Sequence, residues 1–389
     1  MRIALDGSDL AAERVEGPSV YAGELLPRLS HLLQERGHAV ITYLPGPLRG
    51  ATVAGETKII PGSPFWTQRV FAAALRRGKP DILFMPIQML PLFRPRSMKT
   101  VAVVHDLEFL HYPKTYTIIN RVLLRIFTRH AVRKATQLVA DSQYTKDDVV
   151  RVYGRHSTNI TVVHLGVDVT RLTNEAQNKE QEAVKKRHYL SGRFLLFVGT
   201  LQPRKNIAGL VTAFEEVKKA ARSRHPTSLS ELRGAGQATE NDDLRLVIVG
   251  GGEWKAAPIL TRIESSSTRD SIQVLRRIPR EDLMTLYSMA AAFVLPSFSE
   301  GFGMPVLEAM AAGTPVITSN TSSLPEVAGD AAMLVDPNNP SAIAQAILRV
   351  LRDPTLRQDM IAKGRARASE FSWDRAAEQA AAVIEKAGA

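Results

Sequence analysis

Two glutamates eight positions apart frame the stretch of this chain whose residue types are best suited to chemistry. Glu300 and Glu308 lie in the sequence SFSEGFGMPVLEAMAAGTP, which occupies residues 297–315. An apolar run precedes it and predicts a buried strand, and the run at 306–312 predicts a helix that a glycine ends. The motif is therefore strand, glycine loop and helix, with Glu300 in the loop and Glu308 in the early turns of the helix.

This arrangement combines two kinds of binding group. Loop glycines let backbone N–H groups approach an anion, and a helix N-terminus carries about half a positive charge, so the pair suits a phosphate. Ionised carboxylates accept hydrogen bonds from hydroxyl groups, so Glu300 and Glu308 suit polyols. A ligand with phosphates between two polyols is a nucleotide sugar. The alternative, a tight turn before a helix with an ordinary glutamate, does not account for both carboxylates and the glycines together.

The same stretch, read as E-G-F-G-x-P-x-x-E-A-M-A-x-G-x-P-V, resembles the signature of the retaining glycosyltransferases of family four, which have the GT-B fold. The resemblance implies that Glu300 holds hydroxyl groups of the donor sugar and that Glu308 accepts from the ribose. It also places the donor against the loop between them, where backbone N–H groups are offered. The donor-binding residues implied in this loop are Gly301, Phe302, Gly303 and Met304.

A basic pair forms a second motif. Arg204 and Lys205 lie in V-G-T-L-x-P-R-K-N, which begins at the end of a predicted strand, 194–198. Arg can grip a phosphate with two N–H groups and Lys supplies a compact charge. In the resembling family, this stretch, with Gly199, binds the donor and neutralises the leaving diphosphate. A solvated surface pair is the alternative interpretation.

A histidine follows another predicted strand, 100–104. Such a position lies at the carboxyl edge of a parallel sheet, where α/β proteins bind ligands. His105 stands in V-V-H-D-L-x-F-L-x-x-P, which resembles the family stretch whose histidine faces the donor sugar and takes part in catalysis. A hydrogen-bonded loop histidine is the alternative.

Two further donor subsites depart from the family pattern. The loop after the first strand reads Gly17-Pro18-Ser19-Val20-Tyr21, where the family often has Gly-x-Gly followed by Arg-Tyr, so Gly17 is either a diphosphate contact or part of an ordinary turn. Arg277 and Ile278 align with a stretch that faces the base in the family. That stretch usually has a glycine where Arg276 stands, so the identity of the base stays open.

Alternating strands and helices place these motifs in two doubly wound, Rossmann-like α/β domains that face a central cleft, the GT-B architecture. The predicted boundaries are 1–170 for an acceptor-side domain, 171–192 for an interdomain region, 193–370 for the nucleotide-sugar-binding domain and 371–389 for a closing helix that returns to the first domain. Residues 222–243 form a polar insertion. Predicted strands are 2–6, 39–44, 81–85, 100–104, 137–141, 160–163, 194–198, 244–249, 272–275, 292–295, 315–318 and 332–335.

Composition limits the class of protein. The 389 residues are 44% hydrophobic, which is typical of a globular protein of more than one domain. Cysteine is absent, so no disulfide, thiolate metal site or cysteine nucleophile exists. Asp6 and Asp9 interrupt any signal-peptide core, and no uncharged apolar run reaches the roughly 18 residues of a membrane span. These features predict a cytoplasmic location, with a peripheral position on the inner face of the membrane as an option.

The charge is concentrated in the first half of the chain. Net charge is +11, and residues 69–134 contain thirteen Lys and Arg against three Asp and Glu. Such a region indicates an anionic partner. Within it, 118–134 predicts an amphipathic helix with Arg121, Arg125, Arg129 and Arg133 in one stripe and Ile119, Val122, Leu123, Ile126 and Phe127 on the opposing face. We expect either an anionic membrane surface carrying the acceptor, or a solvated stripe above core residues.

Together, these observations predict a hexosyltransferase of class EC 2.4 that moves a hexose, with mannose favoured by the resemblance, from a nucleoside-diphosphate sugar to a glycan or lipid-linked glycan. UDP-glucose, UDP-N-acetylglucosamine and dTDP-rhamnose are alternative donors. Other readings are a starch- or sucrose-synthase-like enzyme or a phosphorylase of the same fold, or a basic nucleic-acid-binding protein, although no nucleic-acid motif is present. No metal or other cofactor is expected, because there is no Asp-x-Asp and no His cluster with metal spacing.

Overall fold

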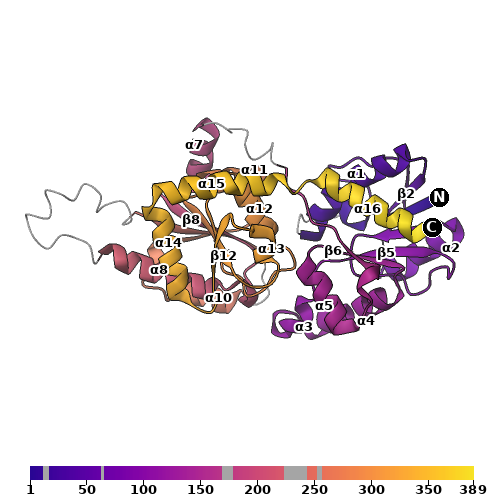
Figure 1. Cartoon of the computed structure of the whole chain (residues 1–389), viewed down its shortest axis with the longest axis horizontal. Coiled ribbons are helices and arrows are strands. Elements are labelled where there is room, and N and C mark those ends of the chain that lie inside the picture. Colours follow the sequence, from indigo (N-terminus) through magenta and orange to yellow (C-terminus); the bar gives the residue numbers. More distant parts are fainter. Residues whose placement is uncertain (12–16, 63–64, 169–177, 223–242, 252–255) are drawn as a thin grey trace, which may run out of the picture. The chain divides into compact units, whose positions relative to one another are not determined.

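The computed structural model in Figure 1 describes the chain except for residues 12–16, 63–64, 169–177, 223–242 and 252–255. The chain forms two compact units. Unit 1 comprises Met1–Gly166 and Phe371–Ala389, and unit 2 comprises Val167–Glu370. The last segment of the chain therefore belongs to the same unit as the first.

Unit 1 is built on a seven-stranded parallel sheet of order β3-β2-β1-β4-β5-β6-β7. The strand order reverses between β1 and β4, which both pair with neighbours in parallel register. Five of these strands are mainly apolar and buried, as expected for a parallel sheet covered on both faces, whereas β3 is largely exposed and β7 fully buries only Ile160. The strands are β1 (Arg2–Asp6), β2 (Ala39–Leu44), β3 (Glu56–Ile59), β4 (Ile82–Met85), β5 (Lys99–Val104), β6 (Gln137–Ala140) and β7 (Ile160–Val162).

Helices cover both faces of this sheet. On one face, α16 packs beside α1 and contacts β4, β5 and β6 (Figure 1). On the other, apolar side chains of α2, α4 and α5 join those of the strands in one buried cluster. The helices are α1 (Gly17–Glu35), α2 (Ala72–Gly78), α3 (Glu108–His111), α4 (Ile118–Lys134), α5 (Gln143–Tyr153) and α16 (Trp373–Gly388), with short η1 (Ser8–Ala11), η2 (Thr67–Phe71), η3 (Pro113–Thr115) and η4 (Ser157–Asn159).

Unit 2 repeats this plan with a six-stranded parallel sheet of order β10-β9-β8-β11-β12-β13. Here the order reverses between β8 and β11, so these two strands flank the switch point of the sheet. The strands are β8 (Phe194–Val198), β9 (Arg245–Val249), β10 (Ile272–Leu275), β11 (Ala292–Leu295), β12 (Val316–Ser319) and β13 (Ala332–Val335).

The helices of unit 2 form two packed groups. α14 packs against α8 and against β11, β12 and β13, whereas α12 packs against α11, α13, α15, β11 and β12. Short polar side chains begin several of them; Asn339 accepts a hydrogen bond from the backbone N–H of Ala342 at 3.0 Å. The helices are α7 (Asn178–Arg187), α8 (Ile207–Arg222), α10 (Ala257–Glu264), α11 (Arg280–Met289), α12 (Met304–Ala311), α13 (Leu324–Ala328), α14 (Pro340–Arg352) and α15 (Pro354–Ser369), with short η5 (Pro203–Lys205) and η6 (Arg269–Ser271).

The prediction of two doubly wound α/β units is confirmed, and the structure adds detail that the sequence did not predict. β3 was missed because its residues, ETKI, are mostly exposed and lack an apolar pattern. The polar insertion predicted at 222–243 lies almost entirely outside the described residues. Of the predicted interdomain region, residues 178–187 form α7, which packs on α11 within unit 2.

The predicted division of α4 into a basic stripe and an opposing apolar face is wrong. Ile119, Val122 and Ile126 are exposed, Ile119 by 72%. They share one helix face with Arg129 and Arg133, because these residues recur at intervals of three or four. The residues that α4 buries are instead Thr128, Ala131 and Val132. The exposed face is therefore apolar towards the start of the helix and basic towards its end.

Candidate active site

The strand order of unit 2 brings the two charged motifs to one edge of the sheet. β8 and β11 are neighbours, with Phe293 paired to Leu196. Since the strands are parallel, the loops that follow them leave from the same edge, on either side of the switch point where doubly wound sheets bind ligands. The first loop carries η5 with Arg204 and Lys205, and the second carries Glu300.

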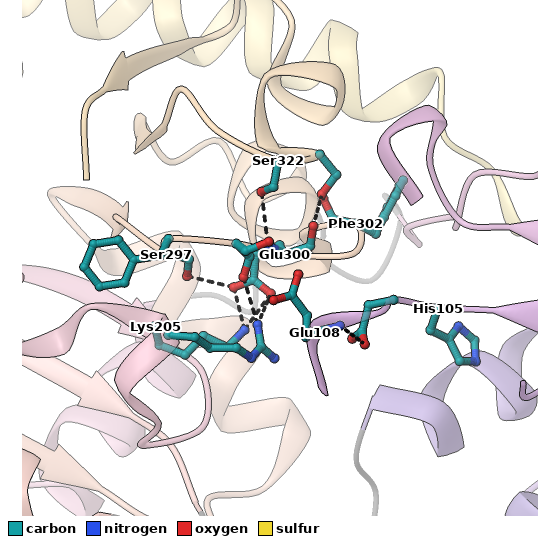
Figure 2. Close-up of polar contacts among 12 residues, drawn as sticks. His105, Glu108, Lys205, Ser297, Glu300, Phe302 and Ser322 are labelled. Atoms are coloured by element: carbon teal, nitrogen blue, oxygen red, sulfur yellow. Dashed lines mark hydrogen bonds and ion pairs between the residues drawn. The ribbon is translucent and has the colours of Figure 1, made fainter. Parts of the chain in front are cut away.

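The Glu300 carboxylate joins these two loops (Figure 2). Its Oε1 accepts hydrogen bonds from Lys205 Nζ at 2.5 Å and Ser297 Oγ at 2.7 Å. Its Oε2 accepts from Lys205 Nζ at 2.7 Å and Arg204 Nη1 at 3.1 Å. Arg204 Nη1 also donates to the backbone carbonyl of Ser299 at 2.9 Å. Arg204, Lys205 and Glu300, which the sequence assigned to separate subsites, thus form one ion cluster.

The cluster keeps Glu300 ionised although the residue is only 6% exposed. Burial alone would raise the pKa of this carboxyl, but the charges of Lys205 and Arg204 and their hydrogen bonds outweigh it and lower the pKa from 4.5 to about 2. Two cations and one carboxylate leave a net charge of +1. The arrangement therefore attracts an anion such as a phosphate to the switch point.

The loop between Glu300 and α12 is held by two serines of the next loop (Figure 2). Ser322 Oγ accepts from the backbone N–H of Glu300 at 3.0 Å, and Ser323 Oγ donates to the carbonyls of Glu300 at 2.8 Å and Phe302 at 2.7 Å. Gly303 has φ +109°, and a Cβ there would lie 2.8 Å from Leu324, so a glycine is required.

The predicted loop residues therefore lead directly into a helix N-terminus. Gly301 and Phe302 lie in the loop, Gly303 caps α12 and Met304 is its first residue. Pro305 has no backbone N–H, and the N–H of Val306 donates to the carbonyl of Gly303 at 2.9 Å. The positive end of the helix dipole, rather than a row of unpaired N–H groups, therefore suits an anion here.

A second close backbone approach shapes the loop after β8. A Cβ on Gly250 would lie 2.0 Å from the carbonyl oxygen of Gly199, so these two segments touch through bare backbone. Leu201 N–H donates to the carbonyl of Gly251 at 3.1 Å, which fixes the same loop. The predicted residue Gly199 thus lies where the chain leaves β8 towards Lys205. The requirement for glycine at position 250 was not predicted.

Glu308 lies in α12 in a different environment. Its Oε2 accepts from Tyr287 OH at 3.0 Å and its Oε1 from Arg280 Nη2 at 3.3 Å. Burial raises the pKa of Glu308, and the charge of Arg280 with the hydrogen bonds from Tyr287 and Arg280 opposes this without cancelling it. The two glutamates of one motif therefore have pKa values displaced in opposite directions.

The loop predicted to face the base joins β10 to α11 at the same edge of the sheet. Arg277 is exposed and has φ +54°, and Ile278 is half-buried. The left-handed backbone thus falls on Arg277, one residue after the position where the family usually has a glycine. Its side chain does not identify a base.

In unit 1, His105 is bound at both ring nitrogens. Nδ1 lies 2.6 Å from Asp141 Oδ2 and Nε2 lies 2.8 Å from the carbonyl oxygen of Pro86. Pro86, His105 and Asp141 each follow directly after one of the adjacent strands β4, β5 and β6. Because both partners are acceptors, both nitrogens carry protons and the ring is an imidazolium. In this geometry His105 is a fixed cation rather than a general base.

Charges around His105 explain its protonation. Burial alone would lower its pKa, but the charge of Asp141 and the two hydrogen bonds raise the pKa to about 9. The Tyr21 ring lies edge-on to the imidazole, with centroids 4.8 Å apart. Burial raises the pKa of Asp9, a change that His105 opposes, and raises the pKa of Asp6 to about 7. The carboxyl edge of unit 1 is therefore rich in titratable groups.

The remaining predicted residue, Gly17, is the first residue of α1 rather than part of the loop that precedes this helix. A Cβ at this position would meet nothing within 4 Å among the described residues, and its φ is not in the left-handed region. Nothing in its described surroundings requires a glycine, and its role as a diphosphate contact stays a prediction.

Two features are absent from the described part of the chain. Outside residues 12–16, 63–64, 169–177, 223–242 and 252–255, no group of three or more His, Asp or Glu is arranged to hold a metal ion. Over the same residues, no helix is both long and apolar enough to cross a membrane.

Several residues that complete the site were missed by sequence reasoning. Ser297, two positions after β11, and Asp141, directly after β6, could have been found because polar residues that follow strands collect at one sheet edge. Arg280 and Tyr287 are seven residues apart, which places them on one helix face. Both bind Glu308, which lies in another helix, so their spacing does not predict this partner.

Comparisons with known proteins agree with this geometry. The family described as Glycosyl transferases group 1 matches residues 178–367, and that described as Glycosyltransferase Family 4 matches residues 22–171. The chain is 32% identical over 305 residues to the O-antigen chain mannosyltransferase B of Escherichia coli, covering 78% of this chain and 74% of that protein. It is 26% identical over 280 residues to the O-antigen chain mannosyltransferase RfbU of Salmonella typhimurium, covering 72% and 67%.

Solved structures share the architecture. The HepE protein of Anabaena in complex with UDP-glucose matches with a TM-score of 0.71 over 99% of this chain and 100% of that chain, at 15% identity, which shows the fold alone. The two parallel-sheet units have the GT-B fold. The chain belongs to the group 1, family 4 glycosyltransferases, so the predicted resemblance and the prediction of a hexosyltransferase are confirmed.

The Glu300 cluster predicts a pH-dependent contribution to stability. We expect Glu300→Gln to lower the free energy of unfolding by about 3 kcal/mol, because it leaves two buried cations with a neutral partner. Since the folded pKa of Glu300, about 2, lies below its ordinary value of 4.5, the contribution is fully present above pH 4.5 and is lost as pH falls towards 2. Urea titrations followed by circular dichroism measure it.

The difference between wild type and Glu300→Gln should stay constant from pH 8 to pH 5 and narrow below pH 4.5. Glu264→Gln, at an exposed position of α10, is the matched control and should change the stability by less than about 0.5 kcal/mol. Equal stability of Glu300→Gln and wild type at pH 7 would contradict the cluster.

Proposed function

We propose that this chain is a retaining transferase that moves a mannosyl residue from a nucleoside-diphosphate mannose to a glycan or lipid-linked glycan. The observation that carries the donor site is the buried Glu300 carboxylate clamped by Lys205 and Arg204 beside the α12 N-terminus. The choice of mannose comes from the relatives, two of which are named O-antigen chain mannosyltransferases.

The donor fits the site by its charges. Its diphosphate would lie against the net positive Arg204–Lys205–Glu300 cluster and the positive end of the α12 dipole. Its ribose would donate to Glu308, and its base would lie along the loop of Arg277 and Ile278. The sugar hydroxyls would meet the loop of Glu300, whose carboxylate also fixes Lys205.

The chemistry follows from this placement. As the bond between the anomeric carbon and the diphosphate oxygen breaks, negative charge grows on the diphosphate, and Arg204 and Lys205 stabilise it. The acceptor oxygen bonds to the anomeric carbon on the face that the diphosphate leaves, and its proton passes to the departing phosphate oxygen. Neither glutamate forms a covalent bond. His105, held as a cation with both of its N–H groups already bonded to Asp141 and the Pro86 carbonyl, would act through its charge rather than take a proton.

A donor panel tests the proposed function. GDP-mannose, UDP-glucose, UDP-N-acetylglucosamine and dTDP-rhamnose are incubated with the enzyme, and release of the nucleoside diphosphate is measured. We expect the mannose donor to be consumed fastest. Preferential use of UDP-glucose with a free sugar as acceptor would favour a sucrose-synthase-like enzyme, and consumption of inorganic phosphate with a glycan would favour a phosphorylase. Either result would overturn the mannosyl assignment.

Charge stabilisation by Lys205 predicts a specific kinetic change. Lys205→Ala should lower kcat more than it raises the donor KM, because the charge on the diphosphate is larger in the transition state than in the ground state. EDTA should leave the wild-type rate unchanged, since no metal is proposed. Lys363→Ala, at an exposed lysine paired with Asp359, is the control and should keep both constants. A strict requirement for manganese or magnesium would show that the charge is stabilised otherwise.

We propose in addition that unit 1 binds an anionic membrane surface through α4. The exposed face of this helix combines apolar Ile119, Val122 and Ile126 with basic residues, which is the composition of an interfacial helix. Phe93, 67% exposed, lies in a loop whose Arg94 donates to the backbone carbonyl of Lys134 at the end of α4. A surface that combines apolar side chains with arginines is more favourable at the interface of an anionic membrane than in water.

Vesicle sedimentation tests this surface. Replacing Arg121, Arg125, Arg129 and Arg133 by Gln should reduce sedimentation with anionic vesicles at low salt, since each basic residue near such a membrane contributes about 1 kcal/mol. Replacing Ile119, Val122 and Ile126 by Ser should reduce it too, because the apolar contact is lost.

The control removes the same charge from exposed positions of unit 2. It carries Gln at Lys179, Lys186, Arg269 and Arg349 and should sediment like wild type. All variants should keep nucleotide binding. Failure of wild type to sediment with anionic vesicles at low salt would remove the membrane proposal and leave a soluble acceptor or a protein partner for this face.

A further inference from the structure

Helix α11 directs two side chains at one carboxylate. Arg280 begins the helix and Tyr287 lies two turns later on the same face. Each binds a different oxygen of Glu308, Tyr287 at Oε2 and Arg280 at Oε1. Two donors on two oxygens fix the plane of a carboxylate as well as its position, which a single contact does not.

Tyr287 is held rigidly for this contact. Its side chain is fully buried, and its ring packs against Phe293 of β11 with centroids 5.5 Å apart. Its backbone carbonyl accepts from Thr314 Oγ1 at 2.5 Å. A phenylalanine would fill the same space, so packing alone does not explain a tyrosine here. The hydroxyl group serves Glu308, which is its hydrogen-bond partner.

We propose that Tyr287 and Arg280 are positioning residues that hold Glu308 as an oriented, ionised acceptor for the ribose hydroxyl groups of the donor. This inference rests on the proposed function, in which Glu308 binds the ribose. An ionised carboxylate accepts stronger hydrogen bonds than a protonated one. A buried carboxyl that lost these two partners would bind a proton more readily and would turn more freely.

Besides burial, Arg280 and Tyr287 are the groups that set the pKa of Glu308. Of the elements packed against α12, α11 supplies the charged and titratable groups that act on this carboxyl, Arg280 and Tyr287. α13 and α15 contribute apolar contacts such as Leu324 against Gly303 and Gly364 against Met310. Burial and the neighbouring Glu308 raise the pKa of Tyr287 well above its ordinary value, so its hydroxyl donates throughout the physiological range.

Binding of ribose and dideoxyribose nucleotides tests the inference. Affinities of GDP and UDP and of their 2′,3′-dideoxy analogues are measured by calorimetry between pH 5.5 and pH 8. We expect wild type to prefer the ribose form and Glu308→Gln to lose that preference. Tyr287→Phe and Arg280→Gln should weaken binding of the ribose form by about tenfold and leave the dideoxy form unchanged, because a hydrogen bond to a charged group is lost.

The pH dependence separates this role from a merely structural one. Removing a donor raises the pKa of Glu308 further, so the carboxyl binds a proton at higher pH. The preference for ribose should therefore disappear at a higher pH in Tyr287→Phe than in wild type as the solution is acidified. Arg280→Lys, which keeps the charge, should restore part of the preference.

Two control variants should bind nucleotides like wild type. Tyr43→Phe removes the hydroxyl of a buried tyrosine that has no hydrogen-bond partner among the described residues, and Arg269→Gln removes an exposed arginine; both should bind like wild type. If wild type does not distinguish the two forms, Glu308 is not the ribose acceptor and the proposed subsite fails. If Glu308→Gln loses the preference while Tyr287→Phe and Arg280→Gln keep it, the positioning role alone is overturned.

If Tyr287→Phe does not fold, Arg280→Gln tests the positioning role by itself, because the Arg280 side chain is partly exposed.

Discussion

The buried ion cluster of Glu300 with Lys205 and Arg204 is the interaction on which the arrangement of unit 2 depends. Burying either ion alone costs several kcal/mol, and this cost is offset only when the partners meet with good geometry. The partners lie on two loops that become neighbours because β8 and β11 are adjacent in the sheet. The strand order, the glycines of both loops and the serines that hold the Glu300 backbone all act to bring these three charges together.

The two glutamates of the motif titrate differently because their surroundings differ. Glu300 has two cations beside it and keeps its charge against burial, so the cluster stays net positive towards a phosphate. Glu308 has one arginine and one tyrosine, and burial dominates its titration. Spacing along the sequence determines that both carboxyls lie on one loop–helix segment, whereas the contacts from other elements set the charge state of each.

Sequence reasoning reached those features that local pattern determines. Buried strands such as 194–198 and helix 118–134 were predicted from apolar runs and periodicity, and the motif residues from their spacing. It failed where a property depends on a distant segment. β3 pairs through its backbone with little apolar signal, the exposed apolar face of α4 has the same period as a buried one, and the glycine at position 250 is needed only because residue 199 approaches it in space.

Both units fix a cation with a buried carboxylate at the carboxyl edge of a parallel sheet. In unit 1, Asp141 holds the His105 imidazolium, and in unit 2, Glu300 holds Lys205 and Arg204. A carboxylate partner orients the cation and keeps it charged over the physiological pH range, at the expense of part of its attraction for an anion. A transferase that stabilises a departing diphosphate needs charges that are already in place when the bond breaks, since reorganisation at that moment would slow the reaction. Under the proposed function, orientation of the cations would matter more than maximal charge, and this would account for a buried glutamate beside a diphosphate.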